Sequence, residues 1–291
     1  MAEKLSPPLR PEFENTSLES GEIGDVQRPL SMGERLANAD PVRRFTILVL
    51  LAVAWELYGR FLDNPLMVPT VTEVGRALWD ATLHGPLLDR IYTSVRVLLI
   101  GYFLGLAIAA VFTGLAVSTR IGTDLLSTLT AMFNPLPAIA LLPIALLWFG
   151  LGIPSLVFVI VHSVLWAVAL NTHSGFQAVS ETMRMAGHNY GLRGVRFVAY
   201  VLMPAALPAI LAGMKIGWAF AWRTLIAAEL VFGVSSRSGG LGWFIFENRN
   251  DLQTAYVFAG LTAVIIIGLL VESVIFRNIE LRTVRRWGMQ R

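Results

Sequence analysis

Three ionisable residues interrupt one long apolar segment, and they are the residues best placed to do chemistry. Lys215, Arg223 and Glu229 lie between Ala205 and Gly233, a stretch otherwise free of charge. At roughly 100° per residue, Lys215 and Glu229 project about 40° apart on a helix, and Arg223 projects about 80° from Lys215. Charges inside an apolar segment are costly and usually line a bundle interior or an aqueous path. A guanidinium there would offer a small anion a charge-assisted hydrogen bond.

Two of these charges allow a second interpretation, as does one proline. Lys215 could snorkel toward the cytoplasm, and Glu229 could lie beyond the hydrocarbon at the outer mouth. Pro137, in the third apolar segment, removes a backbone donor and breaks a helix that otherwise carries no charge. Broken helices are tolerated in membranes where neighbours or a cavity satisfy the freed carbonyls, so the break is either the lining of a path or a packing kink.

Other kinds of chemistry lack the residues that they need. With no cysteine and four histidines, the chain has no thiolate metal site and no cysteine nucleophile. His162 has no ligand-like residue at helical spacing, which favours an interior residue with satisfied hydrogen bonds over a membrane-embedded enzyme. The Gly-x-x-x-x-Gly-Lys-Ser/Thr phosphate loop is absent from the sequence. We therefore expect no catalytic residue, metal or cofactor here, and any ATP to be bound by another chain.

The composition places the chain in a membrane. It has 291 residues, 55% of them hydrophobic and 15% charged, with a mean hydropathy of +0.63. That leaves too little charge to cover a soluble surface. A net charge of +3, scattered along the chain, does not suggest a nucleic-acid partner. The lipid bilayer is the expected environment.

The lengths of the apolar segments predict an all-α integral membrane protein. A spanning helix needs about 20 mostly apolar residues. Two glycines and a proline between Phe149 and Pro154 divide one overlong uncharged segment in two. Residues 1–40 are polar and predict a mostly disordered tail, with at most a short helix at 31–39. Six transmembrane helices are expected, at about 43–62, 92–117, 125–148, 153–172, 207–233 and 254–276.

The distribution of lysine and arginine predicts the orientation. Most of them lie in 1–44, 118–124, 173–204 and 277–291, which share one side if the amino terminus is inside. The positive-inside rule then places both termini in the cytoplasm, with Trp287 as an interfacial anchor among arginines.

Two segments outside the spans have helical patterns of their own. Val71–Leu83 predicts an amphipathic helix at the outer surface, capped by Thr70 or Thr72, which either lies at the interface or contacts an external partner. The cytoplasmic segment 173–204 predicts two short helices joined at Gly191. Such an exposed elbow suits docking into a groove of another protein.

This elbow resembles the signature of the permease subunits of ABC importers. That signature reads EAA, three residues, Gly, nine residues, then Ile-x-Leu-Pro. Here Met185-Ala186-Gly187 takes the EAA place, Gly191 the glycine, and Val201 to Pro204 the ending, with all spacings kept. Met185 departs from the pattern, because the family has an acidic residue there.

The resemblance extends over about 65–280 and narrows to permeases of the nitrate, sulfonate and taurine class. The matching stretches are Val68–Val74, Ser94–Val97, Leu147–Gly152, Asn171–Thr172, Ala221–Trp222, Ala227–Glu229 and Gly239–Trp243. The resemblance implies a type I ABC importer permease fold, in the bacterial plasma (inner) membrane. It implies a second permease copy, with a homodimer favoured by family habit, two cytoplasmic ATPase subunits that carry ATP and Mg²⁺, and an external solute-binding protein.

The resemblance and the charge pattern together give two sets of candidate site residues. The residues expected in ATPase coupling are Met185, Ala186, Gly187, Gly191, Arg193, Arg196 and Pro204. The residues expected along the path of a small anion are Pro137, Trp222, Arg223 and Glu229. The alternative is a secondary transporter or channel that works without an ATPase, although the chain has no convincing internal repeat of the kind common in that class.

Overall fold

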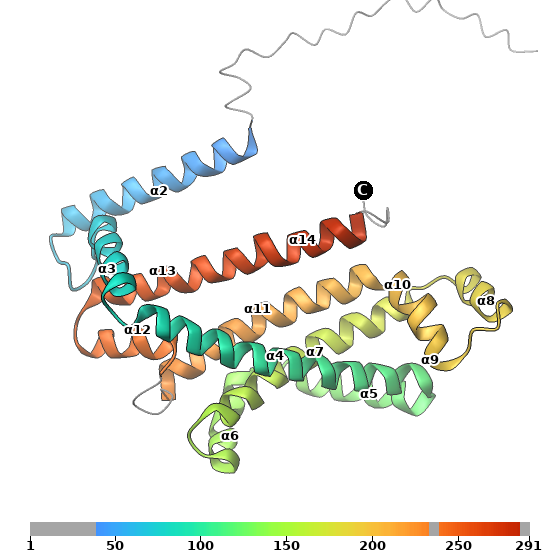
Figure 1. The fold of residues 1–291 in the computed structure, drawn as a ribbon. Coiled ribbons are helices and arrows are strands. Elements are labelled where there is room, and N and C mark those ends of the chain that lie inside the picture. The colour runs from blue at the N-terminus through green and yellow to red at the C-terminus, as the bar shows by residue number, and fades with distance from the viewer. Residues whose placement is uncertain (1–38, 233–238, 286–291) are drawn as a thin grey trace, which may run out of the picture. The chain divides into compact units, whose positions relative to one another are not determined.

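The computed structural model describes residues 39–232 and 239–285, and within these ranges the chain is helical with no strand (Figure 1). The expected tail, its short helix and Trp287 lie outside the described residues. The elements are α2 (Asp40–Leu62), α3 (Val71–Leu83), α4 (Leu87–Ser118), α5 (Arg120–Phe133), η1 (Ala138–Leu141), α6 (Leu142–Phe149), α7 (Ile153–Gln177), α8 (Glu181–Asn189), α9 (Gly194–Phe197), η2 (Val198–Leu202), α10 (Met203–Ala205), α11 (Leu207–Phe232), α12 (Leu241–Asn250), α13 (Thr254–Leu270), η3 (Val271–Phe276), α14 (Arg277–Glu280) and η4 (Leu281–Arg285).

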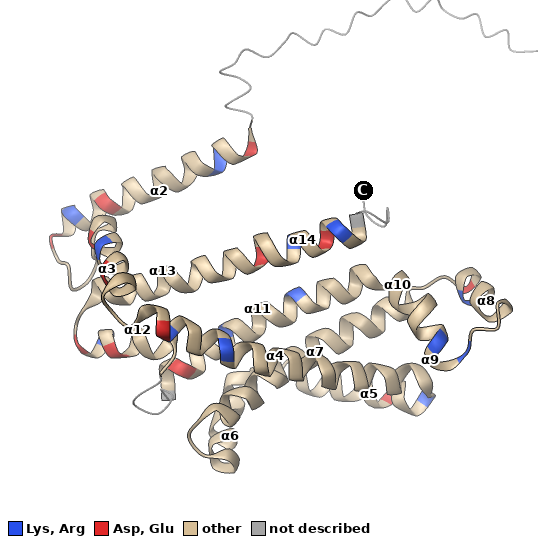
Figure 2. Ribbon diagram, viewed as in Figure 1, with Lys and Arg blue, Asp and Glu red and all other residues tan. Residues whose placement is uncertain are grey.

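The lengths and hydropathies of these helices are those of an all-α membrane protein. Within the described residues, four helices are long and apolar enough to cross a membrane: Asp40–Leu62, Leu87–Ser118, Ile153–Gln177 and Thr254–Val284. Two bent pairs, Arg120–Phe133 with Ala138–Phe149 and Gly194–Ala205 with Leu207–Val231, raise the number to six if each pair is one span. Figure 2 shows charged residues mainly near helix ends, with the middles of α4, α7 and α13 uncharged.

Some helix ends differ from the expected spans. α4 begins at Leu87, whose side chain is fully buried, five residues before the predicted start at 92. α7 continues to Gln177, past the predicted end of its span at 172. Both helices lengthen at polar ends, where hydrogen-bonded backbone continues after the apolar pattern that marks a span has stopped. Which part of each helix lies in lipid stays a prediction.

Residues 1–54 form one unit and 55–291 another. In the described part of the first unit, nearly every side chain from Asp40 to Ala54 is exposed, and Arg43 pairs with Asp40. An exposed apolar helix of this kind suits contact with lipid.

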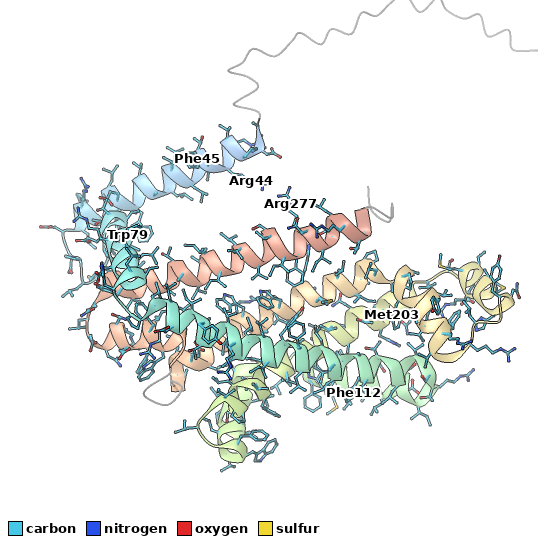
Figure 3. The ribbon with its side chains drawn as sticks, in the orientation of Figure 1. Arg44, Phe45, Trp79, Phe112, Met203 and Arg277 are labelled. Atoms are coloured by element: carbon cyan, nitrogen blue, oxygen red, sulfur yellow. The ribbon has the colours of Figure 1, made fainter. Side chains whose placement is uncertain are left out.

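The core of the second unit is α7, which packs against both α4 and α11. Its side chains Val159, Ile160 and Val164 are fully buried. Phe112 on α4 (Figure 3) meets the Trp166 ring of α7 edge-on, with 6.2 Å between the ring centroids. These contacts fix α7 as the central helix.

Glycines allow the close approach of these helices. A Cβ on Gly101 of α4 would lie 2.6 Å from Ile160 Cγ2, and one on Gly105 would lie 2.8 Å from Val164 Cβ. On α11, a Cβ on Gly213 would lie 2.8 Å from Asn171 Cβ. Gly101 and Gly105 have the GxxxG spacing that lets helix backbones pack closely in membranes.

Replacing Gly101 with valine should destabilise the bundle by about 1–3 kcal/mol, because Ile160 cannot move without disturbing the rest of the core. Gly114 is the matched control, since it lies on the same helix and a Cβ there would meet nothing within 4 Å. Thermal unfolding of the purified chain in detergent, followed by loss of the monodisperse form, measures both variants. Equal midpoints for Gly101→Val and Gly114→Val would contradict the packing argument.

The amphipathic helix is confirmed at its predicted bounds, Val71–Leu83, while its place at the outer surface stays a prediction. Thr70 is the N-cap, its hydroxyl accepting the Glu73 N–H while the Glu73 carboxylate accepts the Thr70 N–H at 2.8 Å. The face with Val74, Ala77 and Ala81 is buried, and α3 packs against α13. The capping box explains why this helix was predictable from local sequence.

Candidate functional site

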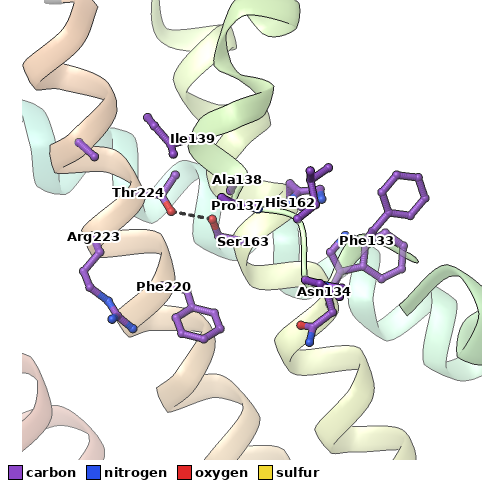
Figure 4. Close-up of a pocket in the computed structure, with 14 residues that line it drawn as sticks. Phe133, Asn134, Pro137, Ala138, Ile139, His162, Ser163, Phe220, Arg223 and Thr224 are labelled. Carbon is purple, nitrogen blue, oxygen red and sulfur yellow. Dashed lines mark hydrogen bonds between the residues drawn. The ribbon is translucent and has the colours of Figure 1, made fainter. Parts of the chain in front are cut away.

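The proline-rich break of the third apolar segment lines a cavity of about 350 Å³ (Figure 4). α7 and α11 supply the other walls. The polar residues of the lining are Asn134, His162, Ser163, Trp166, Arg223 and Thr224. The apolar residues are Phe133, Pro135, Leu136, Pro137, Ala138, Ile139, Phe220 and Ala227.

The break results from the prolines. α5 ends at Phe133 with an Asn134 N–H to Thr130 carbonyl bond of 2.9 Å, and the chain bends by 89° between α5 and the stretch Ala138–Phe149. Pro135 and Pro137 lack the N–H that would continue the helix, and each disfavours helical backbone in the residue before it. Pro137 itself is extended, with ψ of 121°. The break therefore lines a cavity, and its role as the lining of a path stays a prediction.

The α7 and α11 walls are joined by one hydroxyl pair. Ser163 Oγ of α7 lies 2.9 Å from Thr224 Oγ1 of α11. Each hydroxyl can donate or accept, so the pair can also turn toward a ligand. The two residues therefore hold the walls together and line the cavity with polar atoms.

Arg223 supplies the positive charge of the cavity. Its Nε donates to the Ala219 carbonyl at 3.1 Å, and its guanidinium carbon lies 5.1 Å from the centroid of the Phe220 ring. The side chain is exposed, and among the described residues no carboxylate lies within ion-pair distance of it. A guanidinium held in this way keeps its outer nitrogens available to an anion.

The expectation that His162 is a satisfied interior residue is wrong. Among the described residues, neither of its buried ring nitrogens has a hydrogen-bond partner, and neither has Trp166 Nε1. Trp166 stacks on Phe133 with 5.4 Å between centroids and lies 6.2 Å from the His162 ring. Unpartnered polar atoms are costly in a protein interior and indicate a place for a polar ligand. The spacing of His162, Ser163 and Trp166 on one helix was the sequence signal for this cluster.

The other two residues expected on the path lie away from the cavity. Trp222 is buried against α13, with its Nε1–H directed to the Val264 carbonyl at 3.3 Å. Glu229 is 1% exposed and hydrogen-bonded to α4 and α12. The helical projection could not separate these faces, because it does not say which neighbours each face meets. A path role for Pro137 and Arg223 stays a prediction.

Lys215 also lies off the cavity lining. Its Nζ donates to the Glu280 carboxylate of α14 at 2.6 Å, and both side chains are partly buried. The cation therefore fastens α14 to α11, and the structure gives it a partner that neither sequence interpretation had named.

The elbow formed by α8 and α9 has a small core of its own. Phe176, Val179, Phe197, Leu202 and Ala206 are buried together there. Arg184 of α8 donates to the carbonyls of Phe176 at 2.6 Å and Val179 at 3.1 Å, which ties the elbow to the end of α7. The elbow is thus a built structure and not an irregular loop.

Glycines shape the turn between α8 and α9. Gly191 has a φ of +76° and Gly194 a φ of +55°, both in the left-handed region that favours glycine. A Cβ on Gly187 would lie 2.9 Å from Val201 Cγ2 and 3.0 Å from Phe197 Cε2, which explains why the third position of the motif is small. The spacing of the motif is therefore a packing requirement as well as a signature.

The elbow presents apolar and basic side chains to solvent. Tyr190 is 87% exposed and Val195 85% exposed, and Met185 is exposed as well. Arg193 and Arg196 are exposed beside them. Aromatic, methionine and arginine side chains together are typical of protein interfaces. Of the other expected coupling residues, Ala186 is exposed, Gly187 is buried, and Pro204 is half-buried in α10.

Comparisons with known proteins identify similar sequences over the region that holds the cavity and the elbow. Residues 98–284 match the family described as "Binding-protein-dependent transport system inner membrane component". The chain is 30% identical over 242 residues to a putative ABC transporter permease protein of Methanocaldococcus jannaschii, covering 82% of this chain and 90% of that protein. It is 30% identical over 239 residues to the taurine transport system permease protein of Escherichia coli, covering 78% and 83%. It is 29% identical over 247 residues to the nitrate import permease protein of Synechocystis, covering 80% and 86%.

Proposed function

The chain belongs to the family of binding-protein-dependent transport system inner membrane components, and from that premise we propose that it forms the gated path of an ATP-driven importer. It is an ABC importer permease, a membrane subunit rather than an enzyme. The observation that carries the proposal is the exposed surface of the elbow of α8 and α9. No hydrogen bond or ion pair within the described residues involves its exposed side chains Met185, Tyr190, Arg193, Val195 and Arg196.

We propose that the elbow is the docking site for a cytoplasmic ATPase subunit. Two permease copies then bind two ATPase subunits, one on each elbow. ATP and Mg²⁺ are then bound by the ATPases. Closure of the ATPases moves the elbow, and the elbow moves α7 and α11, to which its small core is joined. This assignment places the elbow and both termini in the cytoplasm.

We assign the cavity to the transported ligand. Arg223 supplies a cation, and His162, Trp166 and the Ser163–Thr224 pair supply hydrogen-bonding groups. This set suits a small anion, and relatives of the chain are named for taurine, aliphatic sulfonates and nitrate. The proposed ligand class is therefore a small organic or inorganic anion.

We propose that an external solute-binding protein docks on the outer end of the unit formed by residues 55–291. A hollow of about 480 Å³ lies there between α3 and the start of α13, with Arg76, Asp80 and Tyr256 among its lining residues. The Tyr256 hydroxyl donates to Asp80 at 2.8 Å, and this hydrogen bond, together with His84, lowers the pKa of the Asp80 carboxyl. Asp80 therefore stays ionised to a lower pH than an aspartate without these partners.

The test is to co-express the tagged chain with the proteins encoded beside it, purify it in mild detergent, and reconstitute it in liposomes. An ATPase subunit is expected to copurify in a fixed ratio, and uptake of taurine, an alkanesulfonate or nitrate is expected only with ATP and the external binding protein. A single-chain preparation whose transport persists without ATP would overturn the proposal in favour of a secondary transporter.

A further inference from the structure

Glu229 is a buried carboxylate that the proposed path does not use. It lies on the outer half of α11. Ser94 of α4 donates its hydroxyl to the carboxylate, with Oγ 2.8 Å from Oε1 and 2.7 Å from Oε2, and the Gly242 N–H of α12 donates to Oε2 at 2.8 Å. Ser94 in turn accepts the Leu241 N–H at 2.7 Å. One carboxylate and one hydroxyl therefore satisfy two N–H groups in the first turn of α12.

In this arrangement both carboxylate oxygens of Glu229 act as hydrogen-bond acceptors. Unpaired N–H groups and the helix dipole both favour a negative charge at the start of a helix. A carboxylate so deeply buried is costly unless its oxygens are hydrogen-bonded, and here both are. Because water does not replace lost hydrogen bonds in an apolar membrane region, the partners are tightly linked.

The glycines before and within α12 make the approach possible. A Cβ on Gly240 would overlap Glu229 Oε1 and Ser94 Oγ, and a Cβ on Gly242 would lie 2.6 Å from Glu229 Cβ. The sequence Gly239-Gly-Leu-Gly-Trp243 therefore places the Gly242 N–H against the carboxylate and the Leu241 N–H against Ser94. This close packing explains why glycines occupy positions 240 and 242, which the resemblance to other permeases alone did not explain.

Arg90 extends the same contact along α4. Its Nη1 donates to the Gly239 carbonyl at 2.9 Å, and its Nη2 lies 3.4 Å from Glu247 Oε2 on α12. We call Arg90, Ser94, Glu229 and the first turn of α12 the outer latch. The latch joins three helices that are far apart in sequence.

The latch and the cavity lie on different faces of α11. At roughly 100° per residue, Glu229 projects about 120° or more from Arg223, Thr224 and Ala227, all of which line the cavity. The outer half of α11 is therefore held on one face and forms the cavity wall on another. Loss of the latch hydrogen bonds is therefore expected to displace the part of α11 that forms the cavity wall.

We infer that Glu229 is a positioning residue of the permease, which holds the α11 wall of the cavity in place through Ser94 and the first turn of α12. The inference rests on the proposed function, because it takes the cavity as the path. It replaces the expectation that Glu229 touches the transported ligand.

The test uses the absence of cysteine from the chain. Ala227→Cys places a single thiol on the cavity wall, and its modification rate by a small charged thiol reagent is measured in the full complex in nanodiscs. Adding Glu229→Ala is expected to change that rate about tenfold, because the variant loses the buried hydrogen bonds that join α11 to α4 and α12. Glu229→Gln keeps an acceptor for Gly242 and should change the rate by less than about threefold.

Leu225→Ala is the control for lost packing, because it removes a fully buried side chain from the same helix but none of the hydrogen bonds of the latch. It should lower thermal stability and leave the labelling rate within about twofold. ATP-driven uptake should fall about tenfold with Glu229→Ala and recover in part with Glu229→Gln.

An unchanged labelling rate in Glu229→Ala, or an equal change in Leu225→Ala, would overturn the inference, as would normal uptake by Glu229→Ala. Labelling reports the position of the wall whether or not the chain transports anything. Absence of ATP-driven uptake in the unsubstituted complex would therefore count against the proposed function, while the labelling still decides whether Glu229 positions the wall.

Discussion

Gly191→Val is expected to release the ATPase from the permease while the helix bundle stays folded. Gly191 has a φ of +76°, and a Cβ there would meet nothing within 4 Å. The cost of a side chain is therefore one of backbone conformation and not of collision. For an L-residue it is about 1–2 kcal/mol, and a β-branched residue is especially ill suited. The strain falls on the turn between α8 and α9. That turn sets the relative placement of the two helices, which together form the proposed docking surface.

Gly191→Asn is the matched control, because asparagine visits the left-handed region far more readily than valine. We expect the amount of copurified ATPase per permease, and ATP-driven uptake, to fall about tenfold with valine and to stay near the unsubstituted level with asparagine. Size-exclusion profiles of the permease should be the same for both. Full ATPase recovery with Gly191→Val would remove the elbow from its proposed docking role.

The parts of the fold that could be predicted are those encoded locally. The bounds of α3 follow from a capping box and an amphipathic period within the same residues. The turn at Gly191 follows from the motif, and the structure adds the positive φ that makes the glycine necessary. In both places the residues that determine the structure are close together in the sequence, so a pattern is sufficient.

The parts that could not be predicted depend on distant partners. Ser94 and Glu229 are 135 positions apart, and no period within α11 could show that the carboxylate meets α4 and not the cavity. The helix α12 was missed because its ten residues, Leu241–Asn250, are too few and too polar toward the end to mark a span. The prolines predicted the break between α5 and α6. The 89° angle of the bend depends on packing against α7, which is distant in sequence from the prolines' own pattern.

Arg223→Ala is expected to reduce uptake of the transported anion about 10- to 100-fold at low concentration, the effect of losing one charge-assisted hydrogen bond. Arg223→Lys keeps the charge but loses the planar contact with Phe220 and the forked geometry that matches an oxyanion. It should recover part of the uptake. Uptake is measured in liposomes that contain the full importer, with nitrate, taurine and an alkanesulfonate tested separately.

The argument depends on separating a ligand contact from a structural one, and Lys215 provides the control. Lys215→Ala removes a cation from the same helix, but that cation pairs with Glu280 and does not line the cavity. The Arg223 side chain is exposed and has no described carboxylate partner, so its loss should leave the thermal stability and the copurified ATPase unchanged. Lys215→Ala should show the opposite pattern, with lower stability and an unchanged preference among anions. If uptake of all three anions survives Arg223→Ala, the arginine does not contact the transported ligand, and the cavity must recognise it through His162, Trp166 and the hydroxyl pair alone.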